Sequence, residues 1–373
     1  MSEMREYTVG ELVVNYDRLR KPLSSREREK RKGIYPYYGA TCIFDYVDDY
    51  IFDGEYILMG EDGTVINPDG SPVLQRISGK TWVNNHAHVL QNTSIIDFDY
   101  LYYALKNTNV TGAVTGAVQP KISQANMNAL KISIHTSIAE QQKVASVLKR
   151  IDEKIEQNTR INNNLLEQAV ALYNKMCPFS IDSDLPQDWR VGTVGEIVDI
   201  HDSKRIPLSG KERDQMENKI YPYYGAASLM DFVDNYIFDG KYLLLGEDGT
   251  VVDDKGYPIL QYVWGKFWVN NHAHILTGSN GFNVESLYVL FKQTSVASIV
   301  TGAVQPKISQ ANLRSIKVVI PPKPIIESYN DQVEPIFSLI RTNEDFNSSL
   351  IQVRDALLPK LMSGELDVST VEI

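Results

Sequence analysis

The chain has 373 residues, of which 43% are hydrophobic and 23% are charged, and its formal net charge at pH 7 is −10. This composition is that of a globular protein with room for two or three domains. It excludes a membrane-spanning protein, because no apolar run approaches the roughly 18 residues that a span requires. The acidic balance also argues against a chain that binds nucleic acid through its overall charge alone.

The N-terminus and the cysteines indicate where the chain works. The first residues include early acidic side chains and no apolar signal core, which predicts that the chain is not exported. The two cysteines, Cys42 and Cys177, lie far apart in the sequence. We therefore expect a cytoplasmic protein with two free thiols.

The chain contains a long internal repeat. Residues 35–134 and 221–320 align without a gap at a constant offset of 186, and 56 of the 100 aligned positions are identical. Solenoid repeats are about 20 to 50 residues long, so a repeat of this length is a whole domain that is present twice.

Each copy begins with a short apolar stretch that leads into a basic segment. The first basic segment, 18–33, holds eight Lys or Arg residues against two Glu residues, and the second, 204–220, holds five basic against three acidic residues. A solvated loop is one interpretation of either segment. Because the segments recur at the same place in both copies, the alternative of an anion-binding edge gains support.

The core of each copy is rich in strand-forming residues and is interrupted by turn signals. Asp-Gly pairs occur at Asp53–Gly54, Asp62–Gly63 and Asp69–Gly70, and the first two recur in the second copy. Asp-Gly between alternating apolar residues is a strong hairpin signal. Residues 97–108 and 283–294 instead have apolar residues at helical spacing. Each copy is therefore predicted to be a β-rich α+β domain with several hairpins and one helix.

A long helix is predicted after each copy. Residues 138–176 contain no glycine or proline, and their apolar residues are spaced alternately by four and three, which is a heptad pattern. Residues 327–362 carry a seam that superimposes on the first at an offset of 185. A single apolar seam needs a partner, so we expect the two helices to pair. Two independent surface helices are the alternative.

Asparagines interrupt both helical seams at matching places. Asn158 and Asn162 of the first helix correspond to Asn343 and Asn347 of the second. If the helices pair, these side chains lie level and can hydrogen-bond instead of remaining unsatisfied. Such polar residues set the register of a coiled coil at some cost in stability. Because a pseudo-twofold axis would relate the two domain-plus-helix halves, we expect the pairing to be antiparallel.

Several sequence runs occur in a specific order along the chain. They are LPQDWRVGTVGEIVDIHDSKRIP, YPYYGA, YIFDG, LLLGEDGT, VNNHAHIL, TGAVQPKISQANL, IPPKPIIESYNDQV and ALLPKLMSGELDV. In this order they resemble the specificity subunit of type I restriction–modification enzymes, and the resemblance covers nearly the whole chain. It implies target recognition domains at 1–136 and 178–322, a central conserved spacer helix at 137–177, and a distal conserved helix with a C-terminal tail at 323–373.

The resemblance also implies partners and cofactors. It implies recognition of double-stranded DNA at a bipartite site and docking of two methyltransferase subunits and of restriction or motor subunits. S-adenosylmethionine, ATP and Mg are then expected in the partner subunits, with no cofactor in this chain and no membrane partner. This chain departs from the family pattern because its two domains are unusually alike. We therefore expect two similar, inverted half-sites, since a nearly twofold protein reads related half-sites.

The candidate DNA contacts combine cations for phosphate with hydrogen-bonding side chains for base edges. The run TGAVQPKISQAN is identical at 115–126 and 301–312, and its Gln, Lys and Ser residues have this chemistry. A structural turn into the following strand is the alternative for this run. With the basic segments, the candidate contacts are Arg20, Lys21, Arg26, Arg28, Lys32, Gln119, Lys121, Ser123, Lys204, Arg205, Lys211, Arg213, Gln305, Lys307 and Ser309.

The motif Asn-Asn-His-Ala-His, at 84–88 and 270–274, is the pattern that most suggests a metal site. His86 and His88 would share a face of a strand, but no carboxylate or cysteine stands nearby at ligand spacing. We interpret the motif as part of a buried strand whose polar groups are satisfied internally, with a contact to DNA as the alternative. A metal-dependent nuclease and a protein-binding scaffold are the alternative functions. The chain has no phosphate-binding loop and no methyltransferase signature, so we predict that it is not an enzyme.

Overall fold

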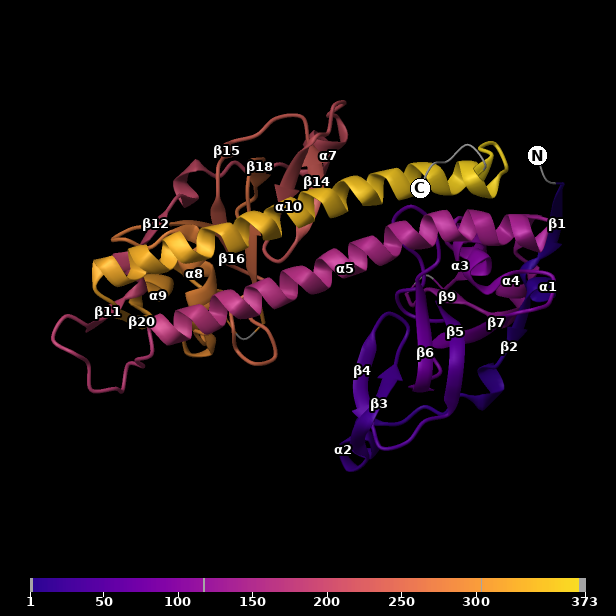
Figure 1. Ribbon diagram of the computed structural model, residues 1–373, viewed down its shortest axis with the longest axis horizontal. Coiled ribbons are helices and arrows are strands. Elements are labelled where there is room, and N and C mark those ends of the chain that lie inside the picture. Colours follow the sequence, from indigo (N-terminus) through magenta and orange to yellow (C-terminus); the bar gives the residue numbers. More distant parts are fainter. Residues whose placement is uncertain (1–2, 117, 303, 369–373) are drawn as a thin grey trace. The chain divides into compact units, whose positions relative to one another are not determined.

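The computed structural model describes residues 3–116, 118–302 and 304–368. The chain forms two compact units, which we call unit 1 (Met1–Asn158 with Asp345–Ile373) and unit 2 (Thr159–Glu344). Each unit contains one β-rich domain and one segment of each long helix, α5 (Ile138–Met176) and α10 (Lys323–Met362) (Figure 1). Both long helices therefore contribute to both units.

The domain of unit 1 is built on a mixed six-stranded sheet in the order β2-β7-β5-β6-β3-β4. Its pairs are antiparallel except β3 with β6, which run parallel. Two smaller pairs, β1 with β10 and β8 with β9, complete the domain. The strands are β1 (Met4–Thr8), β2 (Val13–Asn15), β3 (Lys32–Tyr38), β4 (Ile43–Val47), β5 (Phe52–Gly60), β6 (Leu74–Val83), β7 (Ala87–Asn92), β8 (Val114–Thr115), β9 (Lys121–Ile122) and β10 (Lys131–His135). The helices are α1 (Val9–Leu12), α2 (Ser25–Lys30), α3 (Phe98–Lys106) and α4 (Gln124–Ala129), with 3-10 turns η1 (Asp17–Leu19) and η2 (Thr111–Ala113).

The domain of unit 2 repeats this arrangement with two four-stranded sheets, β12-β19-β16-β17 and β14-β13-β18-β15, and the pair β11 with β20. The strands are β11 (Arg190–Thr193), β12 (Val198–Ile200), β13 (Tyr221–Tyr224), β14 (Leu229–Val233), β15 (Phe238–Asp239), β16 (Tyr242–Gly246), β17 (Leu260–Val263), β18 (Lys266–Val269), β19 (Ala273–Gly278) and β20 (Lys317–Ile320). The helices are α6 (Val194–Ile197), α7 (Gly210–Asp214), α8 (Val284–Phe291) and α9 (Gln310–Ser315), with 3-10 turns η3 (Asp202–Lys204) and η4 (Ala297–Ile299).

The hairpin turn predicted at Asp53–Gly54 is wrong, and so is its counterpart at Asp239–Gly240, where the Gly240 amide donates to the Gly265 carbonyl at 3.1 Å between β15 and β16. Asp53–Gly54 lies inside β5, where Gly54 pairs with Gly79 of β6 and the strand continues beyond it. Both glycines have positive φ, 145° and 71°, so the two facing strands deform together without turning back. Gly63 and Gly70 do lie in turns, with φ of 82° and 86°.

The core of each domain extends onto the long helices. In unit 1, Ile57 of β5 and Leu101 of α3 belong to the same buried cluster as Val144 and Leu148 of α5 and Leu361 of α10. In unit 2, the corresponding cluster joins the sheet and α8 to Ala169 of α5 and to Val333 and Phe337 of α10. Each helix segment is thus part of a domain core as well as a partner for the other helix.

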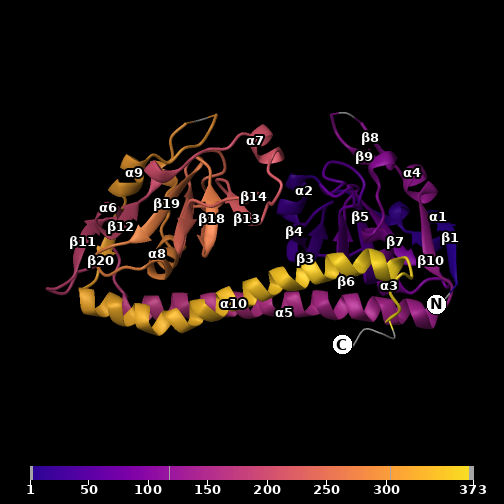
Figure 2. The same cartoon turned by 90° about the horizontal axis from the view of Figure 1, so that it is seen from above.

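The two long helices pair antiparallel in each unit (Figures 1 and 2). In unit 1, Asp152 contacts Arg354 at 2.8 Å, and Asn158 Nδ2 donates to Asn347 Oδ1 at 2.8 Å. Residue numbers therefore decrease along α10 in the direction in which they increase along α5. In unit 2, Asn343 Nδ2 donates to Asn162 Oδ1 at 2.8 Å. These pairs confirm the predicted fold class: two β-rich domains with two long helices in an antiparallel coiled coil.

Asn158→Ala is expected to lower the free energy of unfolding by about 1–3 kcal/mol, because the buried Asn347 amide would lose its partner. Asn158 and Asn347 are 2% and 4% exposed. Replacing both by leucine should restore stability while weakening the control of register. Urea denaturation of the two variants and the unaltered protein measures the effect, and a double variant less stable than Asn158→Ala would contradict this account of the pair.

Within the described residues, no helix is both long enough and apolar enough to cross a membrane.

Candidate nucleic-acid interface

Part of each basic segment is neutralised by aspartates of the neighbouring edge strand. In the first copy, Lys32 Nζ lies 2.7 Å and Arg28 Nε 3.4 Å from Asp45 on β4. In the second copy, Asp231 on β14 receives Arg213 at 3.0 Å. Arg28 and Arg213 thus hold the short helices α2 and α7 against the sheet, so a part of the predicted anion-binding edge has a structural role.

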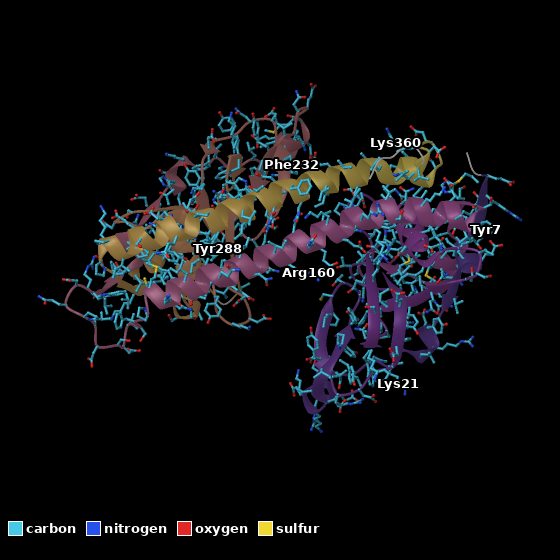
Figure 3. The ribbon with its side chains drawn as sticks, viewed as in Figure 1. Tyr7, Lys21, Arg160, Phe232, Tyr288 and Lys360 are labelled. Atoms are coloured by element: carbon cyan, nitrogen blue, oxygen red, sulfur yellow. The ribbon has the colours of Figure 1, made fainter. Side chains whose placement is uncertain are left out.

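Other candidates of the basic segments remain exposed to solvent. Lys21 and Arg26 in the first copy and Lys204 and Lys211 in the second are all exposed, and within the described part of the chain none of the four forms an ion pair. Figure 3 labels Lys21 at the end of unit 1 that carries α2. These four side chains are free to contact phosphate, as are Arg18 and Lys30 of the first segment, which are also exposed and form no ion pair within the described residues.

Arg20 and Arg205, by contrast, each lie in a partly buried cluster of charged groups. Arg20 Nη1 lies 2.6 Å from Glu61 Oε2 and donates to the carbonyl oxygen of Ala87 at 2.6 Å. Its side chain is 12% exposed, and Glu61 also receives Lys121 Nζ at 3.1 Å. Two candidates that lie a hundred residues apart in the sequence therefore meet at one carboxylate.

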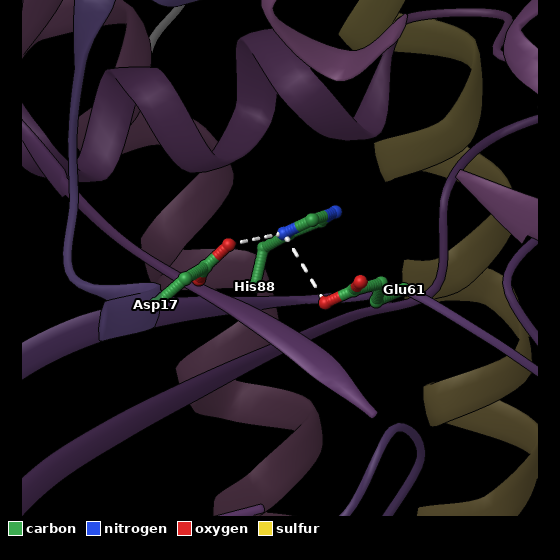
Figure 4. A group of neighbouring side chains, drawn as sticks. All are labelled: Asp17, Glu61 and His88. Atoms are coloured by element: carbon green, nitrogen blue, oxygen red, sulfur yellow. Dashed lines mark hydrogen bonds and ion pairs between the residues drawn. The ribbon is translucent and has the colours of Figure 1, made fainter. Parts of the chain in front are cut away.

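A histidine completes this cluster (Figure 4). His88 is fully buried, its Nδ1 lies 2.6 Å from Asp17 Oδ2, and its Nε2 lies 2.9 Å from the carbonyl oxygen of Ile122. The second copy repeats the arrangement with Asp202, Glu247 and His274. His88 thus joins η1, β7 and the strand that follows the TGAVQP run.

The cluster holds its carboxylates in the charged state. Burial alone would raise the pKa of Asp17, but the hydrogen bond and charge of His88 and the Val89 amide outweigh burial, so the pKa is lowered from 3.8. Burial would likewise raise the pKa of Glu61, yet Arg20, His88 and Lys121 lower it from 4.5.

Asp17, Glu61 and His88 place potential ligand atoms within 4.8 Å of one another, which is compatible with a metal ion. However, Arg20 and Lys121 already supply two positive charges to the same carboxylates. A divalent cation would have to displace or repel both, so the donor set fits a network of ion pairs better than a metal site.

The two histidines of the motif do not act together. His86 lies in the turn before β7, and its Nδ1 contacts Asp62, whereas His88 lies on β7 and contacts Asp17. The prediction that they share a strand face is therefore wrong. The sequence did not reveal the carboxylate partners, because Asp17, Asp62 and Glu61 approach the histidines only through the sheet pairing of β5 with β7 and the η1 turn.

The TGAVQPKISQAN run forms a tight hairpin followed by a short helix in each copy. Ser123 and Ser309 accept hydrogen bonds at 3.2 Å from the amides of Asn126 and Asn312, which makes them the N-caps of α4 and α9. Lys307 lies 3.2 Å from Glu247, as Lys121 lies near Glu61 in the first copy. Gln119 and Gln305 are exposed. The run therefore combines a structural role with an exposed polar surface.

Sequence reasoning missed the ion pairs that join each domain to its long helix. In unit 1, Asp99 of α3 contacts Arg76 of β6 at 2.6 Å and Lys149 of α5 at 2.7 Å. In unit 2, Lys241 contacts Glu334 of α10 at 2.9 Å, and the fully buried Glu285 of α8 contacts Arg341 of α10 at 3.3 Å. The repeat contained a signal for these ion pairs. Lys149 of the first long helix corresponds to Glu334 of the second, and Glu55 of the first domain corresponds to Lys241 of the second. The charges at these positions are therefore reversed between the copies.

Comparisons with known proteins agree with the sequence motifs. The family model described as type I restriction modification DNA specificity domain matches residues 1–167 and 186–344. The MjaIX specificity subunit, from a type I restriction enzyme of Methanocaldococcus jannaschii, is 25% identical over 304 residues, which are 72% of this chain and 69% of the relative. The EcoprrI specificity subunit of Escherichia coli is 28% identical over 126 residues, 34% of this chain and 30% of the relative.

The fold has a counterpart among solved structures. The S subunit of a type I restriction–modification system from M. genitalium superposes with a TM-score of 0.57 and 18% identity, covering 97% of this chain and 96% of that one. At this identity the likeness speaks for the fold alone. Together with the family match, it confirms the resemblance that the sequence motifs indicate, and none of these comparisons supports the alternative of a metal-dependent nuclease.

Proposed function

Because the chain belongs to the type I restriction–modification DNA specificity family, we propose that it selects the DNA sequence for a complex whose catalysis is performed by other subunits. The observation that carries this proposal is that the family match falls on both halves of the chain, one match for each copy of the repeat. Each half has exposed cations in the segment that contains α2 or α7, and each has the same TGAVQPKISQAN sequence, so each offers one DNA-binding surface.

The target is a bipartite site with two similar, inverted half-sites. The clusters around Arg20 and Arg205 have the same partners in both units, and the hairpin runs are identical. The exposed basic segments differ, with Ser25–Lys30 in α2 and Gly210–Asp214 in α7. The shared parts account for the similarity of the half-sites. Their differences are assigned to side chains that reach base edges where the copies differ, in the basic segments and around Ser71/Tyr257 and Ser78/Trp264, because phosphate contacts do not specify sequence.

Two methyltransferase subunits and restriction or motor subunits are the protein partners, and the complex works in the cytoplasm. S-adenosylmethionine, ATP and Mg belong to those partners. The net charge of −10 fits this division, because the partners then supply part of the charge that neutralises phosphate. The isolated chain is accordingly expected to bind DNA weakly and with strong salt dependence.

Lengthening both long helices is expected to lengthen the spacer of the DNA site and leave the half-sites unchanged. Seven residues inserted after Thr159 and seven after Glu344 would keep the heptad phase and add about 10 Å of helix. That length corresponds to about three base pairs, at about 3.4 Å each. Sequencing of modified bases in cells that carry the complex gives the recognised site directly.

Two controls accompany this experiment. A seven-residue insertion in the linker between α5 and β11, at residues 178–189, should leave both spacer and half-sites unchanged. Altered half-sites at an unchanged spacing would overturn the role of the helices as a ruler. The absence of any modified bipartite site for the unaltered complex would overturn the proposed function itself.

A further inference from the structure

Two valines stand out as the most exposed large apolar side chains among the described residues. Val118 is 98% exposed and Val304 is 99% exposed, whereas the next most exposed, Ile34, reaches 78%. They occupy equivalent positions in the hairpins of the two TGAVQPKISQAN runs. A single exposed valine needs no explanation. An exposed valine at the same position of the same hairpin in both copies does need one.

The fold does not account for these valines. At nearly complete exposure their side chains contribute no burial to either domain, so any polar residue would serve the fold as well. Elsewhere on the surface the copies have diverged, for example in the basic segments of α2 and α7. Identity at an exposed apolar position therefore indicates a requirement outside the domain that carries it.

The base of each hairpin is held firmly. In the first copy, β8 pairs with β9, the Gly63 amide donates to the Pro120 carbonyl at 3.0 Å, and the Ile122 amide donates to the Glu61 carbonyl at 2.9 Å. Gly116 has φ +87°, and a side chain there would collide with the carbonyl oxygen of Gln119. The buried His88 ties Ile122 to the ion-pair cluster. The second copy has the equivalent hydrogen bonds, with an isolated bridge between Thr301 and Lys307 in place of the strand pair. Both valines are therefore presented on preorganised supports.

The neighbours of each valine identify the class of ligand. Val118 is followed by the exposed Gln119 and by Lys121, whose side chain is 47% exposed, and the second copy repeats both residues. A cation and an amide suit phosphate and base edges, while a projecting apolar side chain suits a thymine methyl group or an unstacked base step. A protein surface would be a poorer match for this polar surround.

We propose that Val118 and Val304 make apolar contact with the bases of the DNA, one valine in each half-site. This inference rests on the proposed function and adds a residue-level contact to it. Because both hairpins carry the same residue, the contact is common to the two half-sites and does not distinguish them. It complements the phosphate contacts of the exposed cations, which act through charge.

Val118→Ser and Val304→Ser should each weaken binding by about tenfold, which corresponds to about 1.4 kcal/mol. The protein is the full chain assembled with its methyltransferase subunits. The probe is a duplex of about 40 base pairs that carries the site found by sequencing modified bases. Since no charge is removed, the slope of log Kd against log salt should stay unchanged, whereas Lys21→Ala should reduce it.

Two control variants keep the proposal open to refutation. Val118→Ile, which preserves the apolar tip, should bind like the unaltered complex, and so should Ile181→Ser, which changes an exposed apolar residue in the linker. Unchanged affinity in the doubly serine-substituted complex would overturn the proposal, as would loss of binding caused by dissociation of the methyltransferase subunits, monitored by mass photometry. Failure of the unaltered complex to prefer the site would instead refute the proposed function.

Discussion

Arg20→Met is expected to lower the free energy of unfolding of unit 1 by about 3 kcal/mol, even though the sequence marks Arg20 as a candidate DNA contact. The guanidinium is 12% exposed and lies between Asp17 and Glu61, at 3.4 Å and 2.6 Å. Its removal leaves Glu61 with Lys121 and Asp17 with His88, and it removes the guanidinium donor of the Ala87 carbonyl. Arg205→Met should have the same effect on unit 2.

The dependence on pH provides a specific check. Because the pKa of Glu61 is lowered in the folded state, its ionic contribution is present at neutral pH and is lost as the pH falls through that lowered value. The destabilisation by Arg20→Met should therefore be largest near pH 7 and shrink below about pH 4.5. A loss of stability that does not change with pH would show that packing, and not charge, accounts for the effect.

Arg26→Ala is the matched control for a role in DNA binding. Arg26 is exposed and belongs to the same basic segment, so its removal should leave thermal stability unchanged and weaken binding to DNA. If Arg20→Met weakened DNA binding with no change in stability, Arg20 would be a direct contact and the structural account of the cluster would be wrong.

The long helices could be predicted in detail because all their signals are local. A heptad pattern without glycine or proline gave 138–176, and the structure has α5 at Ile138–Met176. The second helix begins at Lys323, four residues before the predicted start. The heptad pattern does not extend over Lys323–Ile326, so it could not reveal this first turn. Spacing along one helix decides which residues share a face, so local sequence suffices.

The ion-pair clusters could not be predicted in this way. Asp17, Glu61 and His88 come from three separate segments, and they meet only because β5 lies beside β7 in the sheet and η1 lies next to β7. For the same reason, composition alone could not show which cations of the basic segments are neutralised. That distinction depends on Asp45 and Asp231, which reach the segments from neighbouring edge strands.

The contacts between domain and helix show how burial decides the size of an electrostatic effect. Glu285 is 0% exposed, and its Oε1 receives Lys241 at 2.6 Å, Tyr262 Oη at 2.7 Å and Arg341 at 3.3 Å. In unit 1 the equivalent acid, Asp99, has a side chain that is 26% exposed and contacts Lys149 at 2.7 Å. Lys241 and Lys149 lie at nearly the same distance from their acids, so the environment of the acid is the main difference.

Lys241→Met is therefore expected to lower the free energy of unfolding of unit 2 by about 3 kcal/mol, since a buried carboxylate would lose its nearest cation. Lys149→Met in unit 1 should cost at most about 1 kcal/mol, because Asp99 remains partly solvated and keeps Arg76. Adding Glu285→Gln to Lys241→Met should recover most of the loss, because the neutral amide has the same shape and needs no cation. Hydrogen exchange of the α8 and α3 amides reports on the two units separately, and equal effects of the two lysine variants would contradict the dependence on burial.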